Sequence, residues 1–95
     1  MTKNVRRAQI VGTGLIGGSI ALALRARGWH VTGRDIDTKR ADRALELDVL
    51  DAVGSDAEAE LAFVAVPASA LEVEIRNTLR ETKGVVTDTG SVKTT

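Results

Sequence analysis

Apolar and polar residues alternate along the chain in blocks whose lengths predict strands and helices in turn. Residues 8–11 form a short apolar run that stops at a glycine-rich turn, which predicts a buried first strand. Residues 16–27 place apolar side chains at helical spacing, and Gly28 provides a stop signal. Residues 29–34 are predicted as a second strand. The chain therefore begins with a strand–helix–strand unit.

The next block predicts a second helix and a weaker edge strand. Asp37 or Thr38 can cap this helix at its N-terminus. The positions expected to face the sheet are Ala41, Ala44, Leu45 and Leu47. Residues 49–53 could hold a short edge strand, and residues 55–60 are a polar link or one helical turn.

Two further apolar runs of strand length complete the pattern. Residues 61–66 end at Pro67, and residues 85–87 end at Asp88. The helix predicted between them has apolar positions four apart, with Gly84 as its stop signal; these positions are Leu71, Ile75 and Leu79, supported by Ala70 and Val73. Right-handed crossovers would place all the strands in one parallel sheet. The predicted fold is α/β and doubly wound, an incomplete sheet of about five strands in one domain over residues 1–95.

Charge and composition favour a small-molecule ligand over a macromolecular one. The 95 residues carry 13 basic and 13 acidic side chains, with no long run of one sign, so binding to nucleic acid or to a membrane surface is not expected. No cysteine is present, which excludes a disulfide framework and a thiolate metal site. The early apolar stretch is interrupted by glycines, so a signal peptide or membrane span is not predicted. A cytoplasmic location is the default expectation.

The strongest motif lies between the first predicted strand and the first predicted helix. It reads Gly12-Thr13-Gly14-Leu15-Ile16-Gly17, a G-x-G-x-x-G turn typical of Rossmann-type dinucleotide-binding domains. The first glycine permits the tight turn, the second lets a pyrophosphate approach, and the third allows close packing of helix on strand. The helix N-terminus would bind the phosphates. The alternative is a glycine-rich turn without a ligand.

Two charged residues at the end of the second predicted strand bear on the choice of cofactor. Asp35 can accept hydrogen bonds from the ribose hydroxyls of the adenosine, which favours NAD over NADP. Arg34 could instead pair with a 2′-phosphate. NAD is the preferred prediction. The alternative for both residues is a solvated turn in which Asp37 caps the helix.

The remaining candidates follow the last two predicted strands, at the carboxyl edge where doubly wound sheets bind ligands. Val66 and Pro67 should border the nicotinamide, as should Thr89 and Gly90. For Pro67 the alternative is a proline that merely stops a strand, and for residues 88–93 it is a polar turn.

Two segments resemble one enzyme family, the prephenate/arogenate dehydrogenases. The first is Val11-Gly12-Thr13-Gly14-Leu15-Ile16-Gly17-Gly18-Ser19 and the second is Thr87-Asp88-Thr89-Gly90-Ser91-Val92-Lys93. Ala65-Val66-Pro67 also matches. The resemblance covers nearly the whole chain, although residues 55–60 are shorter than the family's usual helical insert.

The resemblance implies an NAD(P)-dependent oxidative decarboxylation of prephenate or arogenate in tyrosine biosynthesis. Ser91 matches the family serine beside the substrate hydroxyl and the nicotinamide, so a supporting catalytic role is implied for it. The family's catalytic histidine belongs to a later H-P-x-x-G segment, and a helical domain completes the substrate pocket and most of the dimer interface. Thr95 precedes both, so this chain alone is expected to show little turnover. The resemblance also allows a homodimer.

Two other functions remain as alternatives. A non-catalytic Rossmann nucleotide sensor would share the glycine turn and the ribose carboxylate, but it has no need of the segment from Asp88 to Lys93. Another dehydrogenase of the β-hydroxyacid type, or a pyrroline carboxylate reductase, would share the first strand–helix–strand unit.

Overall fold

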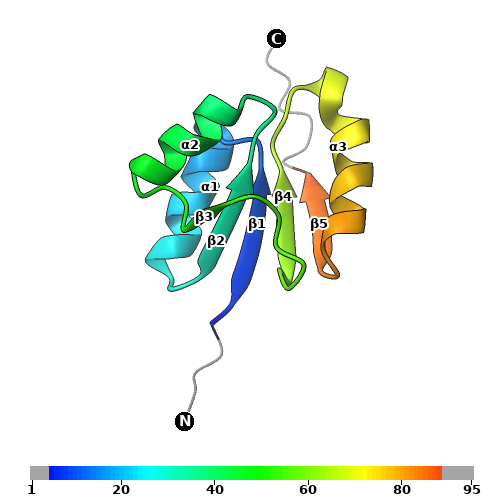
Figure 1. The fold of residues 1–95 in the computed structure, drawn as a ribbon. Helices are drawn as coiled ribbons and strands as arrows, with labels where there is room; N and C mark the ends of the chain where they lie inside the picture. The colour runs from blue at the N-terminus through cyan, green and yellow to red at the C-terminus, as the bar shows by residue number, and fades with distance from the viewer. Residues whose placement is uncertain (1–4, 89–95) are drawn as a thin grey trace.

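A computed structural model describes residues 5–88 of the chain as a layered α/β domain. The elements follow in the order β1 (Arg7–Val11), α1 (Leu15–Ala26), β2 (His30–Arg34), α2 (Thr38–Glu46), β3 (Ala52–Val53), β4 (Leu61–Val64), α3 (Ala68–Glu81) and β5 (Val85–Asp88) (Figure 1). Every predicted strand and helix is present. The edge strand predicted within residues 49–53 is shorter, at Ala52–Val53, and the sequence pattern defined no limits for α3; the other predicted ends differ by two residues or fewer.

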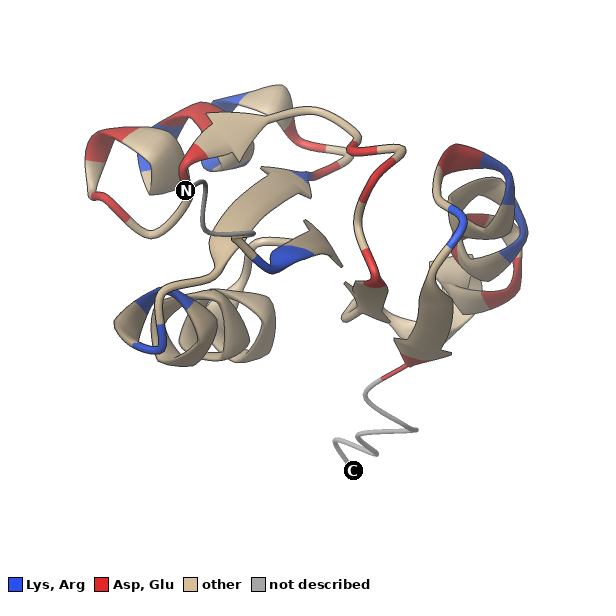
Figure 2. Ribbon diagram, turned by 90° about the horizontal axis from the view of Figure 1, so that it is seen from below, with Lys and Arg blue, Asp and Glu red and all other residues tan. Residues whose placement is uncertain are grey.

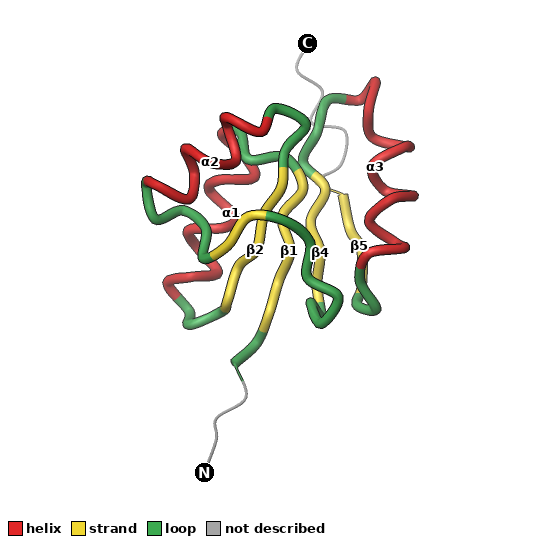
Figure 3. Tube along the Cα trace, viewed as in Figure 1, coloured by secondary structure: helices red, strands yellow, loops and turns green. Residues whose placement is uncertain are grey.

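All strands join one parallel sheet in the order β3-β2-β1-β4-β5 (Figure 3). The chain starts in the middle of the sheet, builds outward through β2 and β3, and then returns to the other side of β1. Helices α1 and α2 lie on one face, whereas α3 lies on the opposite face over β4 and β5 (Figure 2). This arrangement confirms the predicted Rossmann-type, doubly wound fold.

The hydrophobic core lies between the sheet and the first two helices. Ile10 and Val31 project from β1 and β2, Ala21 and Ala44 from α1 and α2, and Leu50 closes the cluster. Leu50 occupies the space above Gly33, because a Cβ at Gly33 would lie only 2.6 Å from the nearest Leu50 side-chain carbon. Because Ala21 and Ala44 are small, both helices approach the sheet closely.

Helix α2 confirms its predicted cap but only part of its predicted inner face. The Asp37 carboxylate accepts a hydrogen bond from the Lys39 backbone N–H at 3.0 Å and so caps the helix. Ala41 and Ala44 are buried as predicted. Leu45 and Leu47 are exposed, contrary to the prediction. The reason is that this short helix covers only β2 and the edge strand β3, so its buried stripe is narrow and Leu50 fills the space instead.

Helix α3 differs most from the predicted pattern. Leu71 and Ile75 are half-buried, but Leu79 is 59% exposed and Val73 is also exposed, so the predicted apolar stripe is only partly correct. The buried positions are polar, namely Glu74 and Thr78. The helix turns these side chains inward because the strand residues that they meet carry polar groups of their own.

The connection from β3 to β4 crosses the α3 side of the sheet without a helix (Figure 2). Asp56 in this segment accepts a hydrogen bond from Arg7 at 2.7 Å, and its backbone N–H donates to Gln9 at 2.8 Å. The polar link that the sequence predicted for residues 55–60 is therefore confirmed. Strand β4 ends at Val64 and not at Val66, because its neighbour β1 turns away at Gly12.

Candidate functional site

The candidate site lies at the carboxyl edge of the sheet, where the ends of β1, β2, β4 and β5 meet. The Gly12 N–H donates to the Arg34 carbonyl at 2.8 Å, and the Ala65 N–H donates to the Val11 carbonyl at 2.8 Å. Val64 at the end of β4 is also in register with Asp88 at the end of β5. Residues distant in the sequence are thus brought to one edge by parallel pairing, as the sequence predicted.

Two glycines of the turn are required by close backbone approaches. Gly12 has φ of +95°, and a Cβ there would lie 2.3 Å from the Ala65 carbonyl oxygen. A Cβ at Gly17 would lie 1.8 Å from the Gly12 carbonyl oxygen. Both contacts are with backbone atoms, so neither position tolerates a side chain without a shift of the fold. The first glycine makes the tight turn, and the last brings α1 against β1.

Gly14 is different, because open space lies above it. No atom outside its immediate neighbours lies within 4 Å of a Cβ built there, and its φ of −75° is one that any residue adopts. Gly14 is also the N-cap of α1, a helix with no side-chain cap and no acidic residue in its first turn. The positive end of the helix dipole is thus left to face an anion. The neighbouring Leu15 is 89% exposed and Ile16 is also exposed.

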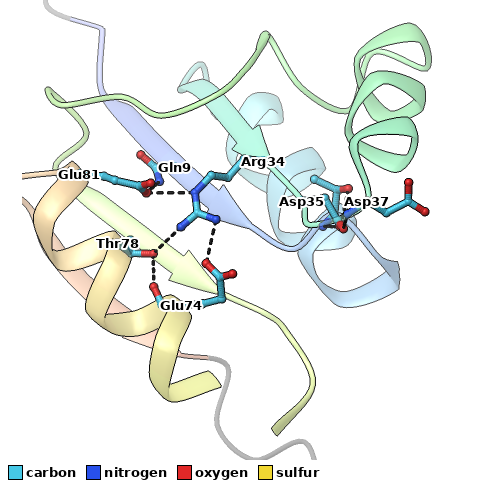
Figure 4. A network of polar contacts seen from close by, with 8 residues as sticks. Gln9, Arg34, Asp35, Asp37, Glu74, Thr78 and Glu81 are labelled. Atoms are coloured by element: carbon cyan, nitrogen blue, oxygen red, sulfur yellow. Dashed lines mark hydrogen bonds and ion pairs between the residues drawn. The ribbon is translucent and has the colours of Figure 1, made fainter. Parts of the chain in front are cut away.

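Asp35 is bound to the glycine turn. Its Oδ2 accepts hydrogen bonds from the Thr13 N–H at 2.7 Å and from the Thr13 hydroxyl at 3.0 Å, and its Oδ1 accepts from the Asp37 N–H at 2.9 Å (Figure 4). The side chain is only 8% exposed, and the guanidinium of Arg40 lies 4.0 Å from Oδ2. The ribose-binding candidate and the phosphate-binding candidate are therefore joined by hydrogen bonds.

Arg34 points away from Asp35, although the two residues are adjacent in the sequence (Figure 4). Its Nη1 donates to Glu74 at 2.8 Å, and its Nε donates to Glu81 at 3.0 Å. A longer contact of 3.3 Å joins Nη2 to the Thr78 hydroxyl. The structure therefore commits this guanidinium to α3, on the face of the sheet opposite α1 and α2.

The other predicted residues lie at the same edge or outside the described residues. Val66 packs beside the turn, since its Cγ1 would lie 3.1 Å from a Cβ at Gly12, and Pro67 follows it as the N-cap of α3. Thr89, Gly90 and Ser91 lie outside the described residues, so their predicted roles stay predictions. Within residues 5–88 no group of three or more histidines, cysteines, aspartates and glutamates could hold a metal ion.

A sequence model described as "Prephenate dehydrogenase, nucleotide-binding domain" matches residues 20–95. The chain belongs to this prephenate dehydrogenase family. The match begins after the glycine turn, so it is independent of the turn geometry described above. It supports the dehydrogenase prediction over the two alternatives, the nucleotide sensor and the other dehydrogenase types.

Individual members of the prephenate dehydrogenase family show the same relationship. The prephenate dehydrogenase of Bacillus subtilis (strain 168) is 35% identical over 94 residues, an alignment that covers 88% of this chain and 25% of that protein. The crystal structure of Synechocystis arogenate dehydrogenase superimposes with a TM-score of 0.82 and 30% identity, covering 93% of this chain and 34% of that one. The crystal structure of Aquifex aeolicus prephenate dehydrogenase superimposes with a TM-score of 0.77 and 25% identity, covering 90% of this chain and 34% of that one. The chain thus spans a quarter to a third of these relatives.

The polar residues of α3 are the part of this prephenate dehydrogenase domain that sequence reasoning missed. Glu74, Thr78 and Glu81 recur at helical spacing on one side of α3, and together with Gln9 they surround Arg34. The spacing could have revealed these residues, because it is the periodicity of a polar stripe on a helix.

A shallow hollow lined by Glu60, Lys83 and their neighbours lies apart from the carboxyl edge. No helix in residues 5–88 is long and apolar enough to cross a membrane.

Proposed function

We propose that this chain is the NAD-binding part of a prephenate or arogenate dehydrogenase. The observation that carries the proposal is the pairing of the open, uncapped start of α1 above Gly14 with the Asp35 carboxylate, joined through Thr13. One end of this unit suits a pyrophosphate and the other suits a ribose. Family membership supplies the nucleotide-binding role.

The residues present fit a dinucleotide. The first-turn amides of α1 would hold the pyrophosphate, with Gly14 leaving the space for it. Carboxylate oxygens have about four lone-pair sites in all, and three of those on Asp35 are used by Thr13 and Asp37. The acceptor site left on Oδ1 would take a ribose hydroxyl. When bound, NAD⁺ would accept the hydride.

The substrate and the reaction are proposed from the named relatives. One is a prephenate dehydrogenase and another is an arogenate dehydrogenase, so we propose oxidative decarboxylation of one of these two substrates. The proposal includes the supporting role of Ser91, a homodimer and a cytoplasmic location. An A. aeolicus prephenate dehydrogenase was crystallised with hydroxyphenyl propionate and NAD⁺, and at 24% identity it supports the fold alone.

The proposal is tested by calorimetric titration of the chain with NAD⁺ and with NADP⁺. We expect NAD⁺ to bind more tightly. Asp35→Ala should weaken NAD⁺ binding by about 1 to 3 kcal/mol, the order for hydrogen bonds to a charged group. The control is Asp42→Ala, which removes an equal charge from an exposed position of α2 and should leave the affinity unchanged.

Two results would contradict this assignment. If the wild-type chain bound neither nucleotide, the glycine turn would be structural only. If Asp35→Ala stayed folded by circular dichroism and bound NAD⁺ as tightly as the wild type, the ribose would be bound elsewhere.

A further inference from the structure

The end of β2 carries two consecutive residues of opposite charge whose side chains take opposite directions. Asp35 turns to the glycine turn, whereas Arg34 turns to α3 (Figure 4). Their Cα atoms are about 3.8 Å apart, the spacing across a trans peptide bond. An arginine side chain that starts this close to the proposed ribose site could turn toward a 2′-phosphate if its present partners released it.

Glu74 and Glu81 hold it back. They bind separate nitrogens of Arg34, Nη1 at 2.8 Å and Nε at 3.0 Å. The Arg34 side chain is 20% exposed and that of Glu74 is 9% exposed, so the pair lies largely out of water. Charged hydrogen bonds in such surroundings resist rearrangement. If Arg34 left, the buried carboxylates would need another hydrogen-bond donor or water in its place.

The two ion pairs orient the Arg34 side chain away from the carboxyl edge of the sheet. Glu81 also accepts a hydrogen bond from Gln9 at 2.9 Å, and Gln9 is in register with Thr32, two residues before Arg34. The Glu81 carboxylate therefore sits beside an earlier part of the strands, and Arg34 folds back over the sheet to reach it. The guanidinium points along the sheet face and not toward the ends of the strands.

The charges act in the same sense. Two carboxylates surround one guanidinium, so the cluster has a formal charge of −1, whereas the charge of Asp35 is faced by the exposed Arg40 guanidinium 4.0 Å from Oδ2. A 2′-phosphate would meet this negative field without a free cation from β2. The ribose hydroxyl of NAD⁺ carries no charge and would not.

We propose that Glu74 and Glu81 select NAD⁺ over NADP⁺ by withholding Arg34 from a 2′-phosphate. This inference rests on the proposed dinucleotide-binding function and extends it. It makes α3, which contributes no residue to the predicted ribose site, a determinant of cofactor choice. Glu74 and Glu81 act through Arg34 and are positioning residues.

The test is the double variant Glu74→Gln and Glu81→Gln, made in the full chain and titrated with both nucleotides. Glutamine keeps the shape and an acceptor oxygen but removes the charge that holds Arg34. We expect the Kd of NADP⁺ to fall by about ten- to a hundredfold, the value of a charged hydrogen bond, with that of NAD⁺ changing by less than about twofold. The matched control is Glu58→Gln with Glu72→Gln, an equal change of net charge at two exposed positions.

A third substitution separates a specific role from a structural one. Adding Arg34→Met to the double variant should abolish the gain in NADP⁺ affinity, because the freed guanidinium is its cause. A second readout is the Nε–H resonance of Arg34 in a ¹⁵N NMR spectrum, which should shift on addition of NADP⁺ in the double variant and stay fixed in the wild type. If the double variant does not fold, Glu81→Gln alone keeps the Glu74 ion pair and should show a smaller gain.

Failure of this inference differs from failure of the proposed function. If the wild type binds NAD⁺ but the glutamine variants keep the wild-type ratio of affinities, the inference is overturned and the function stands. An equal gain in the control pair also overturns it, since general charge would then be the cause. If the wild type binds neither nucleotide, both fall.

Discussion

Replacing Gly17 by alanine is the sharpest test of how the glycine turn is built. The new Cβ would lie 1.8 Å from the Gly12 carbonyl oxygen and 3.2 Å from the Ile10 side chain. Because the closer atom belongs to the backbone, helix α1 has to retreat from β1 by roughly 1 Å to relieve the contact. A gap of that size forfeits up to about half of the dispersion energy of the contacts it opens. The contacts in question are those of Ile20, Ala21 and Leu24 with the core.

We therefore expect Gly17→Ala to lower the free energy of unfolding by about 3 kcal/mol, the upper part of the range for overpacking. For a domain of this size, that loss corresponds to a fall in Tm of roughly 12 to 24 °C. Thermal unfolding followed by circular dichroism measures it. The fluorescence of Trp29, the single tryptophan, provides a second probe that should report the same midpoint.

Gly14→Ala is the matched control, because it adds the same methyl group to the same turn. Its Cβ would enter open space at an ordinary φ, so a weaker N-cap and a less flexible unfolded chain should change stability by no more than about 1 kcal/mol. The methyl group would occupy the space proposed for the pyrophosphate, so NAD⁺ affinity should fall by about tenfold or more. A Gly17→Ala variant as stable as the wild type, or a Gly14→Ala variant as unstable as Gly17→Ala, would refute the reasoning.

Two further predictions concern the periphery of the fold. Asp37→Ala should cost about 1 kcal/mol by removing the α2 cap, measured by urea unfolding, whereas an equal loss in Asp42→Ala would show that charge and not capping is responsible. The hydrogen bond from the Arg6 guanidinium lowers the pKa of Glu60 below its ordinary value of 4.5. This pair therefore contributes stability above pH 4.5 and loses it as the pH falls through the lowered pKa. The Tm difference between wild type and Glu60→Gln should close over that acidic range, and a constant difference would contradict the ion pair.

The parts of the fold that were predictable are those in which local pattern and tertiary contact agree. Few other assignments are compatible with apolar runs of strand length, or with a glycine turn between a strand and a helix. Leu45 and Leu79 were expected to face the sheet but are exposed. Helical periodicity gives the direction of a side chain but not whether another element packs against it. Only the three-dimensional arrangement shows that α2 covers an edge and that α3 meets polar strand residues.

The position of part of the candidate site was predictable for the same reason. Asp35 follows from its place at the end of β2, and the structure brings it to Thr13 of the glycine turn, whereas its role as a ribose ligand stays a prediction. The conformation of Arg34 could not be predicted, because its partners lie 40 and 47 positions away along the chain.

The buried polar layer under α3 explains why cofactor choice would not change through one residue. The connection from β3 to β4 has no helix, and its Asp56 N–H donates to Gln9, which donates to Glu81, which accepts from Arg34. No buried side-chain nitrogen or oxygen in residues 5–88 lacks a hydrogen-bond partner. Freeing Arg34 for a phosphate would leave two carboxylates without it, and an unpaired buried charge is costly. On the role proposed for Arg34, the interactions that stabilise this face also keep it from the proposed ribose site, so a full change to NADP⁺ preference would need both Glu74 and Glu81 to change.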